Sequence, residues 1–209
     1  MGQNMDKLPK TVFLRKGQSY SPEKETLAND LKELFSIIED AHYSYEIWWI
    51  LINRDGRKKY FRAMLHYKEF FEPVARSTLT SMAVALFKLY EYKNNRLSFN
   101  KVLKEVQELK LIDNKLNKKL KRKIKEANAI WKKICILRHN LLAHRHYKLT
   151  KTEIYKIAEI TPNQIKRLIE LSLKIFNTLW TRSNNKPKKI EPVASRDTHR
   201  VLETLLDNL

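Results

Sequence analysis

Arg138 and His144 are the two side chains whose types and spacing best suit them to chemistry. A guanidinium stays charged and holds a phosphate with two donors. An imidazole takes up or releases a proton near neutral pH. A metal-free ribonuclease needs both functions, a base for the ribose 2′-hydroxyl and a cation for the charge that develops on phosphorus. The pair is therefore a candidate catalytic site, although an Arg at this distance before a His also arises by chance.

The helix that must position this pair is predicted to run from Asp113 to Tyr147. Arg138 falls where the next apolar residue of its buried stripe should stand, and His139 and Asn140 lie beside it. Polar groups at the edge of a core are costly to bury unless they are paired or used. Two interpretations stay open, a functional site or a structural cluster in which Arg138 and His139 pair with carboxylates of neighbouring helices. The apolar stripe consists of Leu116, Leu120, Ile124, Ala127, Trp131 and Ile134.

The helical geometry separates the two candidate residues. Six helical steps place Arg138 and His144 about 120° apart around an ideal helix axis. One continuous helix therefore does not form the site alone. Either the helix ends near His144, or two copies of the chain bring their motifs together across a two-fold axis.

A strip of nine basic residues with one acid, Glu126, leads into the Arg138 region. Such a strip is commonly a solvated helix face. Its alternative role is a track for phosphates, and its position beside Arg138 favours that role. The net charge of +19, from 42 Lys plus Arg against 23 Asp plus Glu, also favours a polyanionic partner such as RNA. The expected RNA-binding residues are Lys115, Lys118, Lys119, Lys121, Arg122, Lys123, Lys125, Lys132, Lys133, Arg145 and His146.

The composition predicts an all-α protein, because only three glycines and six prolines interrupt a sequence rich in helix formers. The apolar runs are too short to cross a bilayer, so no membrane partner is expected. The first 18 residues lack the apolar core of a signal peptide. The single Cys135 cannot form an internal disulfide and is expected to be a small buried residue. These features predict a cytoplasmic protein.

The expected organisation is a flexible arm over 1–20, a helical domain over 21–182, a linker over 183–195 and an amphipathic helix over 196–209. Within the domain, Pro22 and Thr161-Pro162 mark helix starts, and Pro73 is expected to split a helix near Glu72. Asn53 to Gly56 is expected to be a turn. The last helix should present Val201, Leu202, Leu205 and Leu206 on one side.

The segment from Arg138 to His144 resembles the motif of the HEPN superfamily (higher eukaryotes and prokaryotes nucleotide-binding). In that motif an Arg is followed by a polar residue, and four to six residues separate the Arg from a His. The helical order over about 21–182 is similar to the abortive-infection, AbiU-like branch. The resemblance implies an HEPN-like helical bundle with one long motif-bearing helix, here followed by a short C-terminal helix.

The family resemblance also implies function. It implies a metal-independent endoribonuclease that needs no cofactor and acts as a toxin or antiphage effector. Arg138 would stabilise the phosphate and His144 would be the acid and base. His139 would fill the polar position and Asn140 would orient the imidazole. A homodimer would build the cleft, and an antitoxin or regulatory protein would be a further partner.

Two alternatives accompany this expectation. Some members of the family are non-catalytic and bind RNA or protein. Toxins of the family that are silenced by nucleotide transfer carry Tyr two residues after the His, where this chain has His146, so the resemblance does not carry over that silencing.

Other candidate residues are predicted to be structural. We expect His42 and His66 to be packing residues, and Tyr43, Tyr45, Trp48 and Trp49 to be core or dimer contacts. Asp113, Glu126, His144 and His146 lack the spacing of metal ligands, so no metal site is expected.

Overall fold

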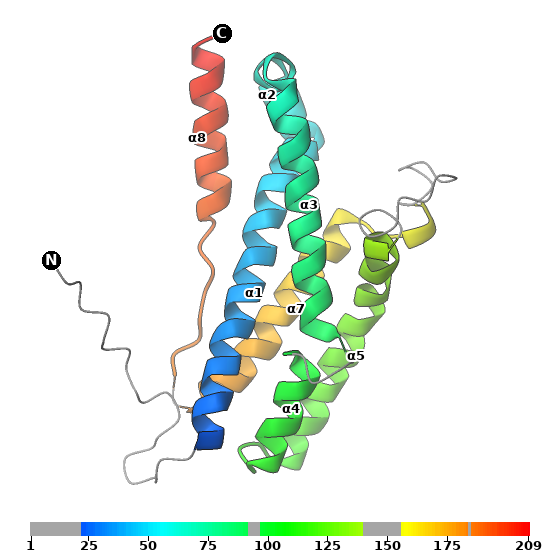
Figure 1. The fold of residues 1–209 in the computed structure, drawn as a ribbon, viewed down its shortest axis with the longest axis vertical. Coiled ribbons are helices and arrows are strands. Elements are labelled where there is room, and N and C mark those ends of the chain that lie inside the picture. Colours follow the sequence, from blue (N-terminus) through cyan, green and yellow to red (C-terminus); the bar gives the residue numbers. More distant parts are fainter. Residues whose placement is uncertain (1–21, 92–96, 140–155, 184) are drawn as a thin grey trace, which may run out of the picture.

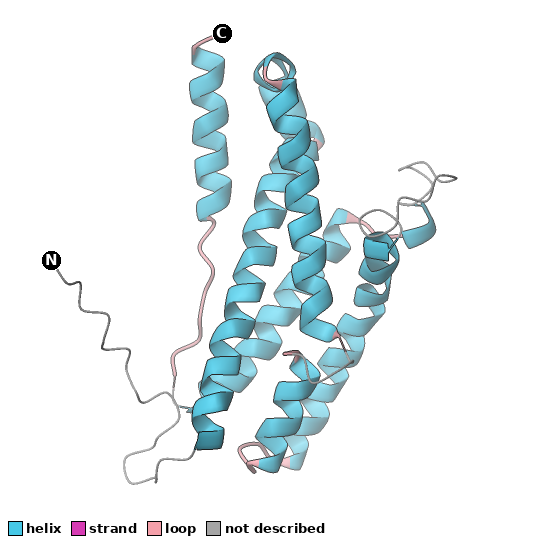
Figure 2. Ribbon diagram, viewed as in Figure 1, coloured by secondary structure: helices cyan, strands magenta, loops and turns pink. Residues whose placement is uncertain are grey.

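The computed structural model describes residues 22–91, 97–139, 156–183 and 185–209. Every regular element within these ranges is a helix, and none of them contains a strand (Figure 2). The all-α prediction is therefore confirmed. The arm predicted for residues 1–20 lies outside the described residues.

Helix α1 (Pro22–Ile52) is the central support of the bundle. It packs against α3 (Lys68–Tyr90) and α7 (Pro162–Trp180) along its length, and α5 (Asn114–Leu137) packs on α3 and α7 (Figure 1). The short α4 (Phe99–Glu108) lies beside α5 at one end of the bundle. This arrangement places the predicted motif helix at the edge of the bundle, with one face buried and the others open.

The core lies between α1, α3, α5 and α7. Met82 and Leu86 of α3 have no exposed surface, so this apolar part of α3 lies at the centre of the bundle. One polar pair lies inside the core, where the Tyr90 hydroxyl contacts Ser172 Oγ at 2.8 Å and Ser172 Oγ donates to the Leu168 carbonyl oxygen. Burial raises the pKa of Tyr90 above its usual range. The pair satisfies two buried hydroxyls and joins α3 to α7.

The break after α2 (Arg54–His66) differs from the prediction. The helix breaks at Tyr67, where ψ is 38°, and Pro73 lies inside α3 without splitting it. Pro73 is the sixth residue of α3, so its missing N–H removes one intrahelical hydrogen bond, to the Glu69 carbonyl oxygen, and both residues are exposed to water. The predicted turn from Asn53 to Gly56 is shorter than expected, because helix α2 already begins at Arg54. The Asn53 side chain caps this helix by accepting a hydrogen bond of 2.7 Å from the Gly56 amide.

The caps of α5 and α7 agree with the sequence. The Asp113 carboxylate accepts from the Leu116 amide at 2.6 Å. At α7, Gln164 N donates to Thr161 Oγ1 while Thr161 N donates to Gln164 Oε1, which completes a capping box. Both helix starts are therefore encoded locally.

An extended segment, 185–192, leads to α8 (Val193–Asp207), which packs on α1 and α2 (Figure 1). Leu202 is fully buried there, but Val201 is 52% exposed, so the prediction that both lie on the docked side is wrong for Val201. At the same interface the Tyr60 hydroxyl lies 2.8 Å from His199 Nδ1 and 3.2 Å from Glu203 Oε1. The division of the chain at residues 182 and 195 stays a prediction.

Candidate active site

Arg138 follows directly after the last residue of α5 and is partly buried. Its guanidinium carbon lies over the Phe87 ring of α3, 4.2 Å from the ring centroid. A guanidinium stacked on an aromatic face gains electrostatic attraction and keeps its edge donors free for other partners. The polar interruption of the buried stripe is therefore accommodated by an aromatic platform.

Phe87 is itself fixed by α5. Its backbone carbonyl oxygen accepts a hydrogen bond of 3.2 Å from Trp131 Nε1, and the two rings lie 5.8 Å apart. Trp131 is two turns before Arg138 on the same side of the helix. The three residues form a cluster around the Phe87 ring, which we name the Phe87 platform (Phe87, Trp131 and Arg138).

The helical geometry changes where the motif begins. Arg138 and His139 adopt a wider, π-type helical turn, whereas α5 is regular up to Leu137. Such turns interrupt a helix where side chains must be re-aimed, and they recur at functional sites.

Of the predicted site residues, Arg138 and His139 lie within the described part of the chain, and His139 is exposed. Asn140, His144, Arg145 and His146 lie outside the described residues, so the pairing of Arg138 with His144 stays a prediction. The structural alternative required carboxylates beside the cluster. Among the described residues, the Arg138 guanidinium contacts the Phe87 ring, and no carboxylate forms an ion pair with it.

Cys135, one turn before Arg138, is half-buried. Burial raises the pKa of its thiol to about 11, although the positive charge of Arg138 acts in the opposite direction. The thiol is therefore protonated at neutral pH and is not an activated nucleophile.

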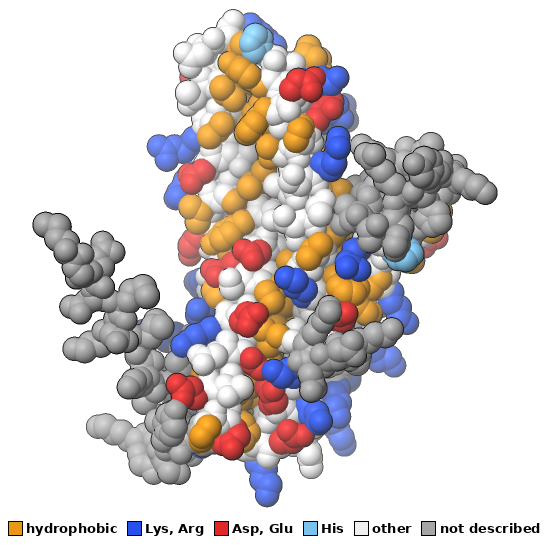
Figure 3. Space-filling model, in the orientation of Figure 1, with side chains coloured by type: hydrophobic (Ala, Val, Ile, Leu, Met, Phe, Trp, Pro, Cys, Tyr) orange, Lys and Arg blue, Asp and Glu red, His pale blue; other side chains and the backbone are white. Residues whose placement is uncertain are grey.

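The basic residues of α5 divide between different surfaces of the helix. Lys133 Nζ donates to the Glu159 carbonyl oxygen at 2.7 Å, and Glu126 pairs with Arg167 of α7. Lys121, Lys125 and Lys132 are exposed and, by helical spacing, share one face with His139. Figure 3 shows basic side chains gathered along the side of the molecule where α4 and α5 lie. On an ideal helix Lys132 and Arg138 are about 120° apart, so this face lies beside the Phe87 platform and does not include it.

The histidines and aromatic residues predicted to be structural are placed as follows. His42 Nε2 lies 3.3 Å from Glu46 Oε1, whereas His66 is exposed with its ring edge against Tyr67, so the packing prediction is wrong for His66. Trp48 is buried, but 36% of Trp49 is exposed. The described residues include no group of three His, Cys, Asp or Glu side chains arranged to hold a metal ion.

Sequence reasoning did not identify Phe87 as a residue of the candidate site. Its spacing in α3 gives no signal of a role, because its partner, Arg138, is far away in the sequence and on another helix. Helix packing alone creates this contact.

The family model for AbiU2, a HEPN family, matches residues 24–204. The chain belongs to the AbiU2 family of HEPN domains. No curated protein and no solved structure matches the chain. AbiU2 membership confirms the HEPN-like helical bundle and the abortive-infection branch, and it indicates a nuclease or defence-related role at the level of the family. The AbiU2 match extends through most of α8, and no described helix is both long and apolar enough to cross a bilayer.

Proposed function

We propose that this AbiU2-family protein is a metal-independent endoribonuclease, which acts in the cytoplasm as a toxin or antiphage effector. The observation that supports the proposal best is the Phe87 platform, which holds the Arg138 guanidinium in place at the start of a HEPN motif. The exposed basic face of α5 lies beside that position and adds positive charge near it. RNA is the proposed substrate, and an antitoxin or regulatory protein is a proposed partner.

The proposed reaction is an internal transesterification. His144 takes the proton of the ribose 2′-hydroxyl, whose oxygen then attacks the adjacent phosphorus. The bond from phosphorus to the 5′-oxygen breaks, and that oxygen receives a proton from an imidazolium. The products are a 2′,3′-cyclic phosphate and a 5′-hydroxyl. Arg138 stabilises the additional negative charge on the phosphoryl oxygens through its edge donors while its face rests on Phe87.

The proposed homodimer supplies the two proton-transfer groups that the reaction requires. Two copies supply two histidines to one composite site, so one imidazole acts as the base and the other as the acid. A shared cleft also gathers positive charge from two α5 helices, which strengthens the attraction for a phosphate backbone.

The test is cleavage of a structured RNA in excess chelator by wild type, His144→Ala and His66→Ala. His66 is an exposed histidine on a different helix, so its substitution is the matched control. Wild type and His66→Ala should cut, and His144→Ala should not. An all-deoxy version of the substrate should be bound and left intact, because it lacks the attacking hydroxyl.

Cleavage of the all-deoxy substrate, or full activity in His144→Ala, would overturn the proposal. If folded, dimeric wild type binds RNA and never cuts it, the non-catalytic RNA-binding module becomes the better description.

A further inference from the structure

A groove of about 340 Å³ lies between α4 and α5, away from the Phe87 platform. Three ammonium groups and three side-chain amides line it, together with two aliphatic side chains, and no carboxylate is among the lining residues. The polar residues are Lys104, Lys121, Lys125, Asn100, Gln107 and Asn128. This surplus of donors and positive charge suits an anion and disfavours a metal cation.

The groove also contains a donor that lacks an acceptor. Asn100 Nδ2 is buried and has no hydrogen-bond partner among the described residues. A buried donor without a partner is energetically unfavourable. Asn100 Nδ2 pairs with an acceptor oxygen of a ligand in the groove once the side chain turns toward the groove. Phosphate oxygens are acceptors of this kind. The unmet donor and the three lysines therefore point to the same class of ligand.

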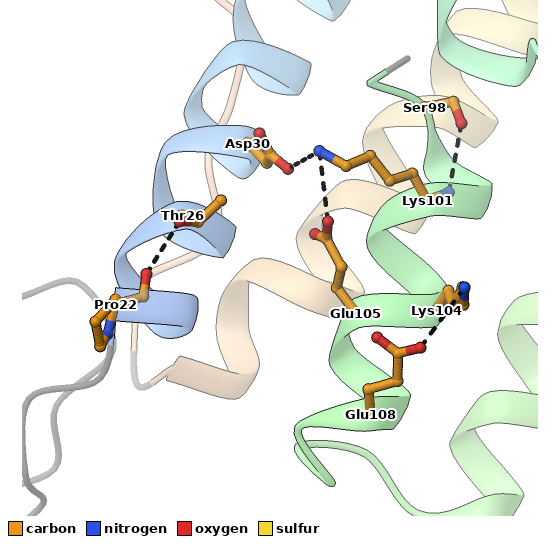
Figure 4. Close-up of polar contacts among 8 residues, drawn as sticks. All are labelled: Pro22, Thr26, Asp30, Ser98, Lys101, Lys104, Glu105 and Glu108. Atoms are coloured by element: carbon orange, nitrogen blue, oxygen red, sulfur yellow. Dashed lines mark hydrogen bonds and ion pairs between the residues drawn. The ribbon is translucent and has the colours of Figure 1, made fainter. Parts of the chain in front are cut away.

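Helix α4 is fastened independently of any ligand (Figure 4). Lys101 Nζ lies 2.7 Å from Asp30 Oδ2 of α1 and 3.4 Å from Glu105 Oε1. These contacts engage one acid of α1, Asp30, and one acid of α4, Glu105, where the two helices meet. The groove wall is therefore positioned before a ligand arrives, which lowers the entropic cost of binding.

One acid does compete for a groove lysine. Glu108 Oε1 lies 3.7 Å from Lys104 Nζ, and both side chains are more than 60% exposed. Exposed pairs of this kind contribute little. A phosphate, which offers more acceptor oxygens than one carboxylate, can take the place of Glu108.

The groove and the candidate active site lie on different sides of α5, because 13 helical steps place Lys125 and Arg138 about 140° apart around an ideal helix axis. Lys121 and Lys125 lie on the same exposed face of α5 as Lys132 and His139, because spacings of four, seven and seven residues return to one side of a helix. Lys125 and Arg138 are about 20 Å apart along the helix axis at a rise of 1.5 Å per residue. A strand with stacked bases covers this axial distance in about six nucleotides, and it needs more to pass around the helix.

We infer that the groove between α4 and α5 binds the phosphodiester backbone of the RNA substrate at least about six nucleotides from the bond that is cut. The identification of the bound polyanion as RNA rests on the proposed function. The inference assigns α4 a part in substrate binding and sets a minimum useful length for the substrate.

The experiment compares two triple variants that remove equal charge. The groove variant is Lys104→Ala, Lys121→Ala and Lys125→Ala, and the control is Lys166→Ala, Lys174→Ala and Lys189→Ala, which are exposed lysines elsewhere. The probes are non-cleavable 2′-O-methyl RNAs of about 20 and about four nucleotides, titrated over a range of salt concentrations.

The groove variant should bind the long RNA at least about tenfold more weakly, and its slope of log affinity against log salt should fall by about two. The control should stay within about threefold of wild type, because net charge alone acts through screened, long-range attraction. Binding of the short RNA should be similar for all three proteins. Equal losses in the two triple variants would overturn the inference, because net charge rather than the groove would then set affinity.

A second measurement needs no substitution. Lysine acetylation of wild type, followed by mass spectrometry, should show that the long RNA protects Lys104, Lys121 and Lys125 more than Lys166 and Lys174. Uniform protection would count against the groove. Both assays measure binding of an RNA that cannot be cut, so a failure of the groove is distinguishable from a failure of catalysis by His144.

Discussion

The stack of Arg138 on Phe87 makes a prediction that can be tested without any activity. In a double-mutant cycle, Phe87→Leu removes the ring and Arg138→Met removes the charge while keeping an unbranched side chain. A guanidinium over an aromatic face contributes roughly 0.5–1 kcal/mol when exposed and about 2 kcal/mol when desolvated. Arg138 is partly buried and its guanidinium carbon is 4.2 Å from the ring centroid. We expect a coupling energy of about 1 kcal/mol.

The single substitution Phe87→Leu should cost more than the coupling alone. It also removes the ring contact with Trp131, which is worth about 0.5–1.5 kcal/mol for an aromatic pair. We expect a total loss of about 2 kcal/mol in the free energy of unfolding, or roughly 4–8 °C in Tm for a chain of this size. The Trp131 hydrogen bond should survive, because its acceptor is the backbone carbonyl oxygen of Phe87.

The assay is urea unfolding of the wild type, both single variants and the double variant, with Phe87→Tyr as a control that keeps a ring face. Arg138→Met should cost less stability in the Phe87→Leu background than in wild type or Phe87→Tyr. If the two substitutions are additive within about 0.3 kcal/mol, the ring does not stabilise the guanidinium and the argument for a positioned Arg138 fails.

Three further predictions concern stability and reactivity. Tyr90→Phe should lower the free energy of unfolding by about 1 kcal/mol in a denaturant titration, because it removes one buried hydrogen bond while Ser172 keeps its donation to a backbone carbonyl. Gly56→Ala should lower Tm markedly, because the added Cβ would collide with the Ile50 carbonyl oxygen, and an unchanged Tm would contradict this. Cys135, with a pKa of about 11, should react with iodoacetamide at pH 8 more than about a hundredfold slower than a free thiol. Its rate should rise about tenfold per pH unit until the pKa is reached, whereas a flat profile would refute the raised pKa.

Local signals in the sequence predicted much of this fold. The caps at Asp113 and Thr161 and the buried stripe of α5 depend on residues three or four positions apart, which act within one helix. Arg138 was predicted as a site residue for the same reason, since it interrupts a local period. The break at Tyr67 was not predicted, because its Tyr-Lys sequence carries no recognised break signal and Pro73 carries a misleading one.

The rest of the candidate site depends on which helices meet. The Phe87 ring under Arg138 and the groove formed with Lys104 join residues that are distant in the sequence. Hydrophobic periodicity shows which face of a helix is buried but not against which neighbour. The nine basic residues of α5 therefore looked equivalent in the sequence, whereas the fold gives Lys133 a structural hydrogen bond and leaves Lys121 and Lys125 to line a groove.

The attachment of α8 has a consequence for how the intact chain holds together. The helix is joined to the bundle by the extended segment 185–192 and docks through Leu202 and the contacts at Tyr60. Its docking is intramolecular, at the millimolar effective concentration that a short tether provides. A single protease cut between 185 and 192 would turn α8 into a separate peptide that dilution removes, and the hydrophobic surface around Tyr60, Ile50 and Leu51 would then face water. The covalent continuity of that short segment thus protects the bundle against aggregation.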